Sequence, residues 1–307
     1  MQTRAKSVQY LRIALPFHPR AAIIFKALGE FAMLPFDHGV INTLGEMDQA
    51  AARYTSLGFA LTPRGYHTLG SINHLAVFGD TYLELLGYAP GERSKRAELW
   101  VHPPGLSGLA LRPDDAAALH TQMVARGLAV EPLKDFSRPV EVDGATCDAA
   151  FRTFQLDRGL IANGRFFFCQ HKTPELIWRA ADQQHPNGAQ NIRAAYIAAN
   201  NPQVVLDLLA QTPGLSRAGN QIKTAQTTLI IDTPKALALL LGGDRPDLLP
   251  DLLTEPMRMV ALDITCTALD QVAQVLETAA LPYTRADDAI SLTPEVALGL
   301  FLRFVPA

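Results

Sequence analysis

The chain has 307 residues, of which 48% are hydrophobic and 19% charged, and its formal net charge is −3. This composition provides for one large or two ordinary domains, and the small negative charge excludes nucleic acid as a predicted partner. No apolar run reaches the roughly 18–20 residues of a membrane helix. The three cysteines form no CxxC pair. They therefore predict a reducing, cytoplasmic setting and neither a zinc knuckle nor a disulfide framework.

Residues 1–32 differ from the rest, because every charge before Glu30 is basic. Pro16, His18 and Pro19 interrupt the apolar stretches, so a secretory signal is not predicted. Two interpretations stay open: a basic targeting segment, or a loose extension that precedes a start at Met33. We treat these residues as a basic N-terminal extension outside the fold.

The elements expected after this extension follow a repeating order. The first unit is a strand, a helix and three strands, over residues 36–44, 47–58, 59–65, 71–79 and 81–88. The second unit has the same order, over residues 106–112, 113–127, 128–133, 149–156 and 165–171. The third and fourth units begin with strands 191–199 and 259–266, which lead into helices 202–211 and 269–280. Residues 240–253 read as a Gly/Pro-rich connection.

A βαβββ unit that occurs four times predicts an α+β protein built from modules. The sheet of one module leaves a face uncovered, so we expect the modules to pair and curl into two open-barrel halves around a cleft. Pro, Asn and Gly cluster in residues 183–190 and mark the expected boundary. The predicted halves are 33–190, which would hold the active site, and 191–307.

The first half resembles a known family. The stretches DHGVIN, AAARYTSLGF and RGYHTLGSINHLAVFGDTYLELLGY are similar to the first module of the vicinal oxygen chelate superfamily, within its glyoxalase-like domain group. QHKTPELIW and HPNGA also resemble that group. The superfamily includes glyoxalases, extradiol dioxygenases, fosfomycin-modifying enzymes, epimerases and metal-free antibiotic-binding proteins, so the resemblance implies the fold more than the reaction.

In this superfamily the metal ligands come from the first and last strands of a module. The resemblance therefore implies that His38 and Glu84 are metal ligands. The surroundings of Glu84 agree with this, because a lone carboxylate in the apolar strand YLELL needs a partner if it is buried. The alternative is that Glu84 pairs with an arginine or faces water.

The second module offers fewer candidates. Its first strand, GLSGLALR, has no His, Asp or Glu. Its last strand ends in Gln170 and His171. If the strand ends align, His171 is the counterpart of Glu84, and a slip of one residue would present Gln170 instead. We expect His38, Glu84 and His171 to form a set of two histidines and a carboxylate, suited to Fe, Mn, Ni or Zn. The alternative is a His171 that bonds to the backbone.

Further candidates belong to substrate binding and proton transfer. His67 is a candidate acid or base together with Glu84 and His171, and otherwise orders its loop. Asn73 is expected to face the cleft in place of its neighbour His74. Arg152 could bind an anionic substrate, and otherwise it is solvated. We assign Trp178 and His185 to the linker between the halves; His18, His102 and His120 receive no role.

The favoured function is a metal-dependent lyase, isomerase or dioxygenase that chelates a small oxygen-rich substrate with a divalent metal. The empty first strand of the second module favours an alternative, a metal-free protein that binds an aromatic or antibiotic-like molecule. An interaction role without catalysis is a third possibility. The expected partner is a small molecule, with no nucleic acid and no membrane, and a homodimer stays open.

Overall fold

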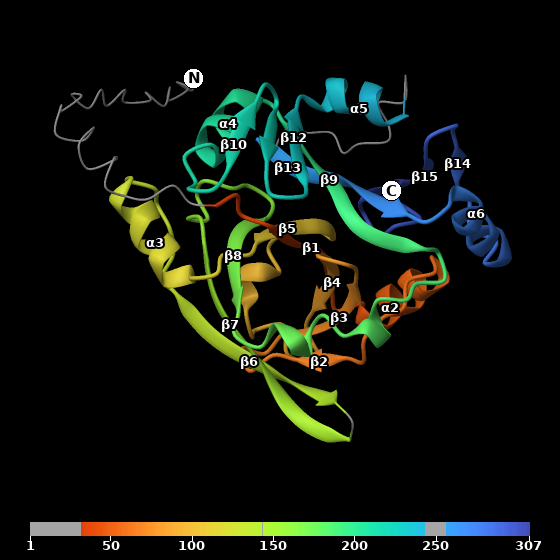
Figure 1. Cartoon of the computed structure of the whole chain (residues 1–307), viewed down its shortest axis with the longest axis horizontal. Helices are drawn as coiled ribbons and strands as arrows, with labels where there is room; N and C mark the ends of the chain where they lie inside the picture. The colour runs from red at the N-terminus through yellow and green to blue at the C-terminus, as the bar shows by residue number, and fades with distance from the viewer. Residues whose placement is uncertain (1–31, 143, 243–255) are drawn as a thin grey trace, which may run out of the picture. The chain divides into compact units, whose positions relative to one another are not determined.

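The four βαβββ units build two eight-stranded sheets in the computed structural model, which describes residues 32–142, 144–242 and 256–307. Units one and two share the first sheet, in the order β2-β3-β4-β1-β5-β8-β7-β6. Units three and four share the second, in the order β10-β11-β12-β9-β13-β16-β15-β14. The predicted α+β fold of paired modules is confirmed (Figure 1). The basic extension lies outside the described residues.

The first strands of the two modules, β1 and β5, lie at the centre of the first sheet, and β2 and β6 are its edges. They are β1 (Phe36–Leu44), β2 (Gly65–Tyr66), β3 (Ile72–Val77), β4 (Tyr82–Gly87), β5 (Gly105–Leu111), β6 (Lys134–Val142), β7 (Ala145–Gln155) and β8 (Arg165–His171). Within each module the first and last strands are parallel neighbours, and the two modules meet through the antiparallel pair β1 and β5.

The second sheet repeats this plan. Its strands are β9 (Ala189–Ala199), β10 (Ser216–Ala218), β11 (Gln221–Lys223), β12 (Thr228–Asp232), β13 (Met257–Cys266), β14 (Thr284–Arg285), β15 (Ile290–Leu292) and β16 (Phe301–Pro306). One helix of each module contributes to the apolar core that both sheets share: α2 (Met47–Ser56), α3 (Ala116–Ala125), α4 (Pro202–Leu209) and α6 (Leu269–Thr278).

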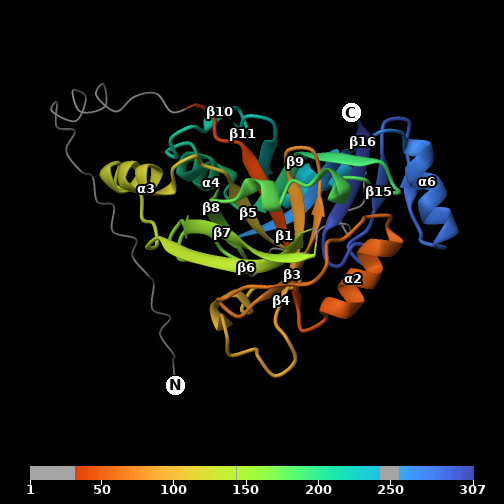
Figure 2. The same cartoon turned by 60° about the horizontal axis from the view of Figure 1, so that its bottom comes forward.

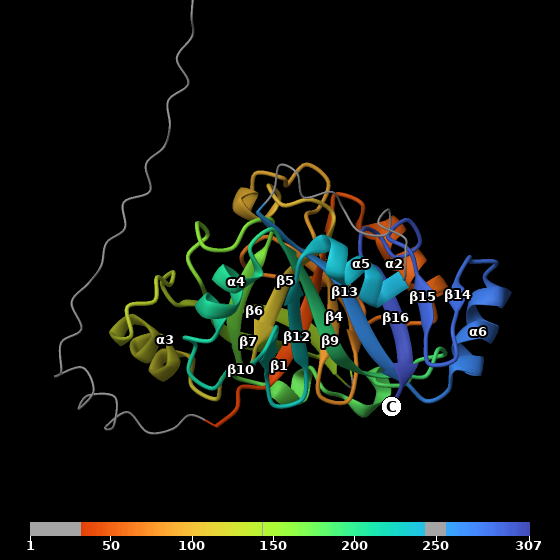
Figure 3. The same cartoon turned by 90° about the horizontal axis from the view of Figure 1, so that it is seen from above.

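One helix was not predicted. α5 (Pro234–Gly242) follows β12 and lies over β9 and β13 (Figure 3). Its residues Leu237 and Leu241 are buried against Ala194 and Phe301 of the second sheet. The sequence suggested a connection from residue 240, because Gly242 and the residues after it break the helical pattern. The described part of α5 ends at that glycine.

Two strands of the first sheet also differ from expectation. The strand expected over residues 59–65 is wrong, since only Gly65–Tyr66 pair as β2, and Pro63 interrupts the segment before it. The expected strand 128–133 is replaced by β6, which forms a long hairpin with β7 (Figure 2). Polar and apolar residues mix along β6, so its register depends on pairing with β7 more than on its own pattern.

The two edges of the first sheet come together. The backbone N–H of Thr68, just after β2, donates to the carbonyl of Ser137 in β6 at 3.0 Å. The N–H of Ser137 donates back to Thr68 Oγ1 at 3.3 Å. These bonds close the sheet around its own inner face, where Val40, Leu75 and Phe151 are buried. The described helices include none that is long and apolar enough to cross a membrane.

The segment between the two sheets is fastened by buried polar side chains. His185 accepts from the Ala60 N–H at 3.0 Å and donates from its other nitrogen to the Val77 carbonyl at 2.9 Å. Asn187 donates to the Leu57 carbonyl at 2.9 Å. Both imidazole nitrogens of His185 are thus satisfied by backbone groups, which gives this histidine a structural role.

Candidate active site

The inner face of the first sheet surrounds a cavity of about 780 Å³, including its open mouth. Strands from both modules line it. The polar side chains that face it include His38, His67, Asn73, Glu84, Arg138 and Arg165. The apolar walls include Leu75, Phe136, Phe151 and Phe167. A cavity of this size, with polar groups that converge on one wall, is typical of a site for a small molecule.

A β-bulge places two consecutive polar residues in this region. In a regular strand Asp37 and His38 would face opposite sides, but the register of β1 against β5 shifts between Phe36 and His38. The bulge lets Asp37 turn toward its neighbour, and Asp37 Oδ2 accepts from His38 Nδ1 at 2.8 Å. Nε2 of His38 is therefore the nitrogen that points at Glu84, with Glu84 Oε2 3.6 Å away.

Glu84 is buried at the centre of this wall. Its Oε1 accepts from Asn73 Nδ2 at 2.7 Å and lies 3.9 Å from His67 Nε2. His67 is held by Ser71, whose Oγ is 2.8 Å from Nδ1. Asn73 thus faces the cavity as expected, while His74 bonds to the Thr62 carbonyl outside it. The buried Oδ1 of Asn73 has no hydrogen-bond partner among the described residues.

The environment sets the charges of these groups. Burial acts to raise the pKa of Glu84, but His38, His67 and the Asn73 hydrogen bond outweigh it, so the pKa is lowered and Glu84 is an anion. Burial lowers the pKa of His67 to about 4, with Glu84 opposing the shift. His67 is therefore neutral near pH 7. One carboxylate between two imidazoles is the chemical core of the cavity.

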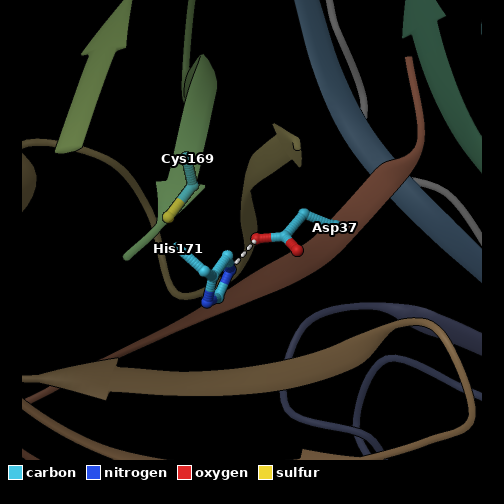
Figure 4. Close-up of side chains that lie close together, drawn as sticks. All are labelled: Asp37, Cys169 and His171. Atoms are coloured by element: carbon cyan, nitrogen blue, oxygen red, sulfur yellow. Dashed lines mark hydrogen bonds and ion pairs between the residues drawn. The ribbon is translucent and has the colours of Figure 1, made fainter. Parts of the chain in front are cut away.

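His171 lies on the other side of Asp37 from this core. Its Nε2 donates to Asp37 Oδ2 at 2.9 Å, and its ring packs against Trp178. With Cys169 these residues form a compact cluster whose possible ligand atoms all lie within 4.8 Å of one another (Figure 4). Burial raises the pKa of the Cys169 thiol well above its usual value. The cluster is thus a thiol, a carboxylate and an imidazole, and its carboxylate oxygen Asp37 Oδ2 also accepts from His38.

The structure does not bring His171 to His38 Nε2 and Glu84, as the sequence had suggested. The first residue pair between β1 and β4 includes His38, and the pair that joins Val40 and Glu84 lies two residues further along both strands. In the second module the first residue pair between β5 and β8 includes Gly108, and the β8 residue two positions further along is Phe167. The counterpart of Glu84 is therefore Phe167. The end-to-end alignment was misleading, because β8 continues past that position.

Two other expected substrate residues also face away from the cavity. Gln170 accepts from the Ala116 N–H at 3.2 Å and donates to the Asp114 carbonyl, at the beginning of α3. Arg152 forms an ion pair with Asp135 at 2.7 Å. It alternates with Phe151 and Thr153, which line the cavity. Both side chains have local structural partners instead.

The residues of the cavity core fit a divalent cation. Donors about 2.1 Å from one ion lie about 3–3.5 Å apart, close to the 3.6 Å between His38 Nε2 and Glu84 Oε2. Asp37 holds the far nitrogen of His38, the arrangement common around metal-bound histidines. His67 adjoins the other oxygen of Glu84. The chain would supply His38 and Glu84 as ligands, with His67 beside them.

Comparisons with known proteins agree with this architecture. A family model described as a glyoxalase-like domain matches residues 36–212, more than half of the chain. The chain therefore belongs to the glyoxalase-like domain family and has the vicinal oxygen chelate fold. No curated protein matches the sequence at a significant level.

Three solved structures share the fold at low identity. A hypothetical protein from Staphylococcus aureus has a TM-score of 0.62 and 14% identity over 90% of this chain and 100% of its own. A mutant of 4-hydroxymandelate synthase from Streptomyces coelicolor has a TM-score of 0.52 and 11% identity over 90% and 93%. A fusion of a xylose isomerase-like TIM barrel with a 4-hydroxyphenylpyruvate dioxygenase has a TM-score of 0.55 and 11% identity over 91% of this chain and 50% of that protein.

Proposed function

We propose that this chain is a metal-dependent enzyme, a lyase, isomerase or oxygenase, that acts on a small oxygen-rich molecule in the cavity of the first sheet. The observation that carries the proposal is the pair His38 and Glu84, 3.6 Å apart on the cavity wall. Family membership supports the class of site. The two dioxygenase-related neighbours are named for aromatic substrates, which supports a small organic ligand.

A divalent cation held by His38 and Glu84 would act as a Lewis acid toward substrate oxygens. The rest of the chemistry belongs to the side chains. Asp37 fixes the ring of His38, so Nε2 carries the lone pair that faces the cavity. Asn73 orients Glu84 through its hydrogen bond. His67, neutral near pH 7, can accept a proton from a substrate group that lies next to Glu84.

A second candidate is a metal-free binding protein. Two side chains of the second module favour it. Phe167 and Cys169 face the cavity from β8, where they add an apolar wall and a neutral thiol. Enzymes of this fold that bind their metal through both modules would need donors there. The two functions predict different metal contents.

The test is metal analysis of protein purified without a metal-binding tag and reconstituted separately with Fe(II), Mn(II), Ni(II) and Zn(II). We expect about one equivalent in the wild type and at least a tenfold loss in His38→Ala and Glu84→Ala. Cys169→Ser should retain the metal. Loss in Cys169→Ser alone would place the ion in the buried cluster, and no metal in any protein would leave the binding-protein reading.

A further inference from the structure

Two guanidinium groups of the cavity have no counter-ion of their own in the part of the chain that the structure describes. Arg138 projects from β6 and is only 4% exposed, yet it lines the cavity. Arg165, at the start of β8, is half-buried and lines it too. Neither guanidinium forms an ion pair or a hydrogen bond with any described residue. The interior of the sheet therefore carries positive charge that the described residues leave unpaired.

The other cations nearby are paired. Arg96 contacts Glu98 at 3.2 Å, and Arg158 contacts Glu131 at 2.7 Å. Arg152, on the far face of β7, binds Asp135. Because an unpaired charge that is removed from water is costly, the buried Arg138 and the half-buried Arg165 around one cavity need a reason. Burial lowers the pKa of Arg165 to about 10 and also lowers that of Arg138, but both stay charged near pH 7.

Glu84 cannot serve as their partner. It is the carboxylate in the cavity core, and its field acts on both arginines from a distance. Its oxygens are engaged by Asn73 at 2.7 Å and faced by His38 and His67. The single negative charge of Glu84 interacts with Asn73, His38 and His67, so the two guanidinium groups leave an excess of positive charge in the cavity. An anion entering the cavity would correct the balance.

Aromatic rings line the same cavity as the two arginines. Phe136 and Phe151 stack with ring centres 5.1 Å apart. The guanidinium of Arg165 lies 4.6 Å above the ring of Phe167. A ligand in the cavity with these arginines would also contact these rings, which favours an apolar, flat body over a hydrated one. Charge and shape thus point to the same kind of molecule.

We infer that the cavity binds an organic anion, a carboxylate or phosphonate with a flat apolar body, whose charge is balanced by the positive field of Arg138 and Arg165. The inference rests on the proposed function for the reaction, because the anion would lie beside His38 and Glu84. Binding itself needs no metal. Planar guanidinium groups suit carboxylate and phosphonate oxygens through paired hydrogen bonds.

The test is calorimetric titration of the metal-free protein with phenylphosphonate and with benzoate, and with neutral benzamide as the matched probe. We expect both anions to bind and benzamide to bind at least tenfold more weakly. Arg138→Gln and Arg165→Gln should each weaken anion binding at least tenfold, as the loss of a charge-assisted contact predicts. Arg152→Gln, a paired arginine outside the cavity, should leave it unchanged.

The variants also report on the free protein. If Arg138 is held without a partner, Arg138→Met should unfold at a higher temperature than the wild type when no anion is present. A lower unfolding temperature together with unchanged anion binding would overturn the inference. Equal binding of benzamide and benzoate would do so as well.

The metal proposal can fail separately. Anion binding by a wild-type protein that takes up no metal on reconstitution would support the inference and remove the metal enzyme. Stoichiometric metal with no anion binding would remove the inference alone.

Discussion

The two sheets have the same strand order, but the histidine and the carboxylate at the core of the first have no counterpart among the described residues of the second. In the first sheet His38 pairs with the first residue of β4, and Glu84 lies two residues further on. In the second, Ala194 pairs with the first residue of β12, and Ile230 lies two residues further on. The positions of the histidine and the carboxylate are therefore occupied by alanine and isoleucine.

The second sheet also has a helix where the first has space. α5 packs Leu237, Ala238 and Leu241 against the face that carries Ala194. The equivalent region of the first sheet is the cavity between β1, β4 and β6. The comparison shows that the fold supplies two curved faces and the side chains decide their use. In the second sheet α5 fills the face and stabilises the fold. In the first sheet the face stays open and carries charged side chains.

The largest expected difference between the halves concerns two buried aspartates. Asp37 holds two imidazoles, and despite burial its pKa is lowered by His171 and His38. Burial raises the pKa of Asp263, which accepts from Tyr196 at 2.8 Å and has Arg303 at 3.3 Å without hydrogen-bond alignment. We expect Asp37→Asn to cost about 3–5 kcal/mol at pH 7 and Asp263→Asn less than about 1 kcal/mol. Urea unfolding measures both.

The pH dependence of the two variants should have opposite signs. The folded pKa of Asp37 is below its unfolded value of about 4, so its stabilisation is present above pH 4 and is lost as pH falls toward the folded pKa. The folded pKa of Asp263 is raised, so its contribution is greatest below pH 4 and declines as pH rises through the folded pKa. Equal costs for the two variants at pH 7 would contradict this contrast.

The filled face can be opened by one substitution. Leu237 is completely buried between α5 and the second sheet, while Leu239, on the same helix, is 64% exposed. Leu237→Ala should lower the free energy of unfolding by about 2–4 kcal/mol, because it removes buried methyl groups and leaves a cavity. Leu239→Ala should stay within about 0.5 kcal/mol of the wild type. If the two cost the same in urea unfolding, α5 does not stabilise the second sheet as described.

The fold could be predicted because its evidence lies in local patterns. Strand β8 was expected over residues 165–171 and occupies them, since three phenylalanines followed by polar residues define a buried strand and its end. Helix α2 was expected to end at Gly58, and that residue has a positive φ of 86° after the last turn. The repeated order of these elements then fixed the pairing of modules.

The site could be predicted only in part, because its geometry depends on register. The bulge that turns Asp37 toward His38 leaves no mark in the sequence, and strict alternation would have separated the two residues. Arg138 lies on β6, whose pairing with β7 was not predicted, so the burial of Arg138 could not be predicted either. His171 was misplaced by the extra length of β8.

The smallest predicted effect concerns His67, and it again separates the halves, because residues 191–307 contain no histidine. The folded pKa of His67 is about 4, against about 6.5 in the unfolded chain. The unfolded chain therefore binds the proton first as pH falls, so stability is lost between pH 6.5 and pH 4. Between pH 7 and pH 5 this loss is about 2 kcal/mol.

His67→Gln should remove this loss, so its free energy of unfolding should decline by about 2 kcal/mol less than that of the wild type over the same interval. The physical reason is that glutamine cannot take the proton that the unfolded chain gains at position 67. Tyr66→Phe is the matched control, because the Tyr66 side chain is 56% exposed next to His67 and carries no imidazole. Identical pH slopes in His67→Gln and in the wild type would mean that His67 is hydrated in the cavity and titrates as it does in water. Glu84 would then face a protonated imidazole below about pH 6, and the cavity of the first sheet would bind a cation more weakly than the hydrogen bond between His38 and Asp37 suggests.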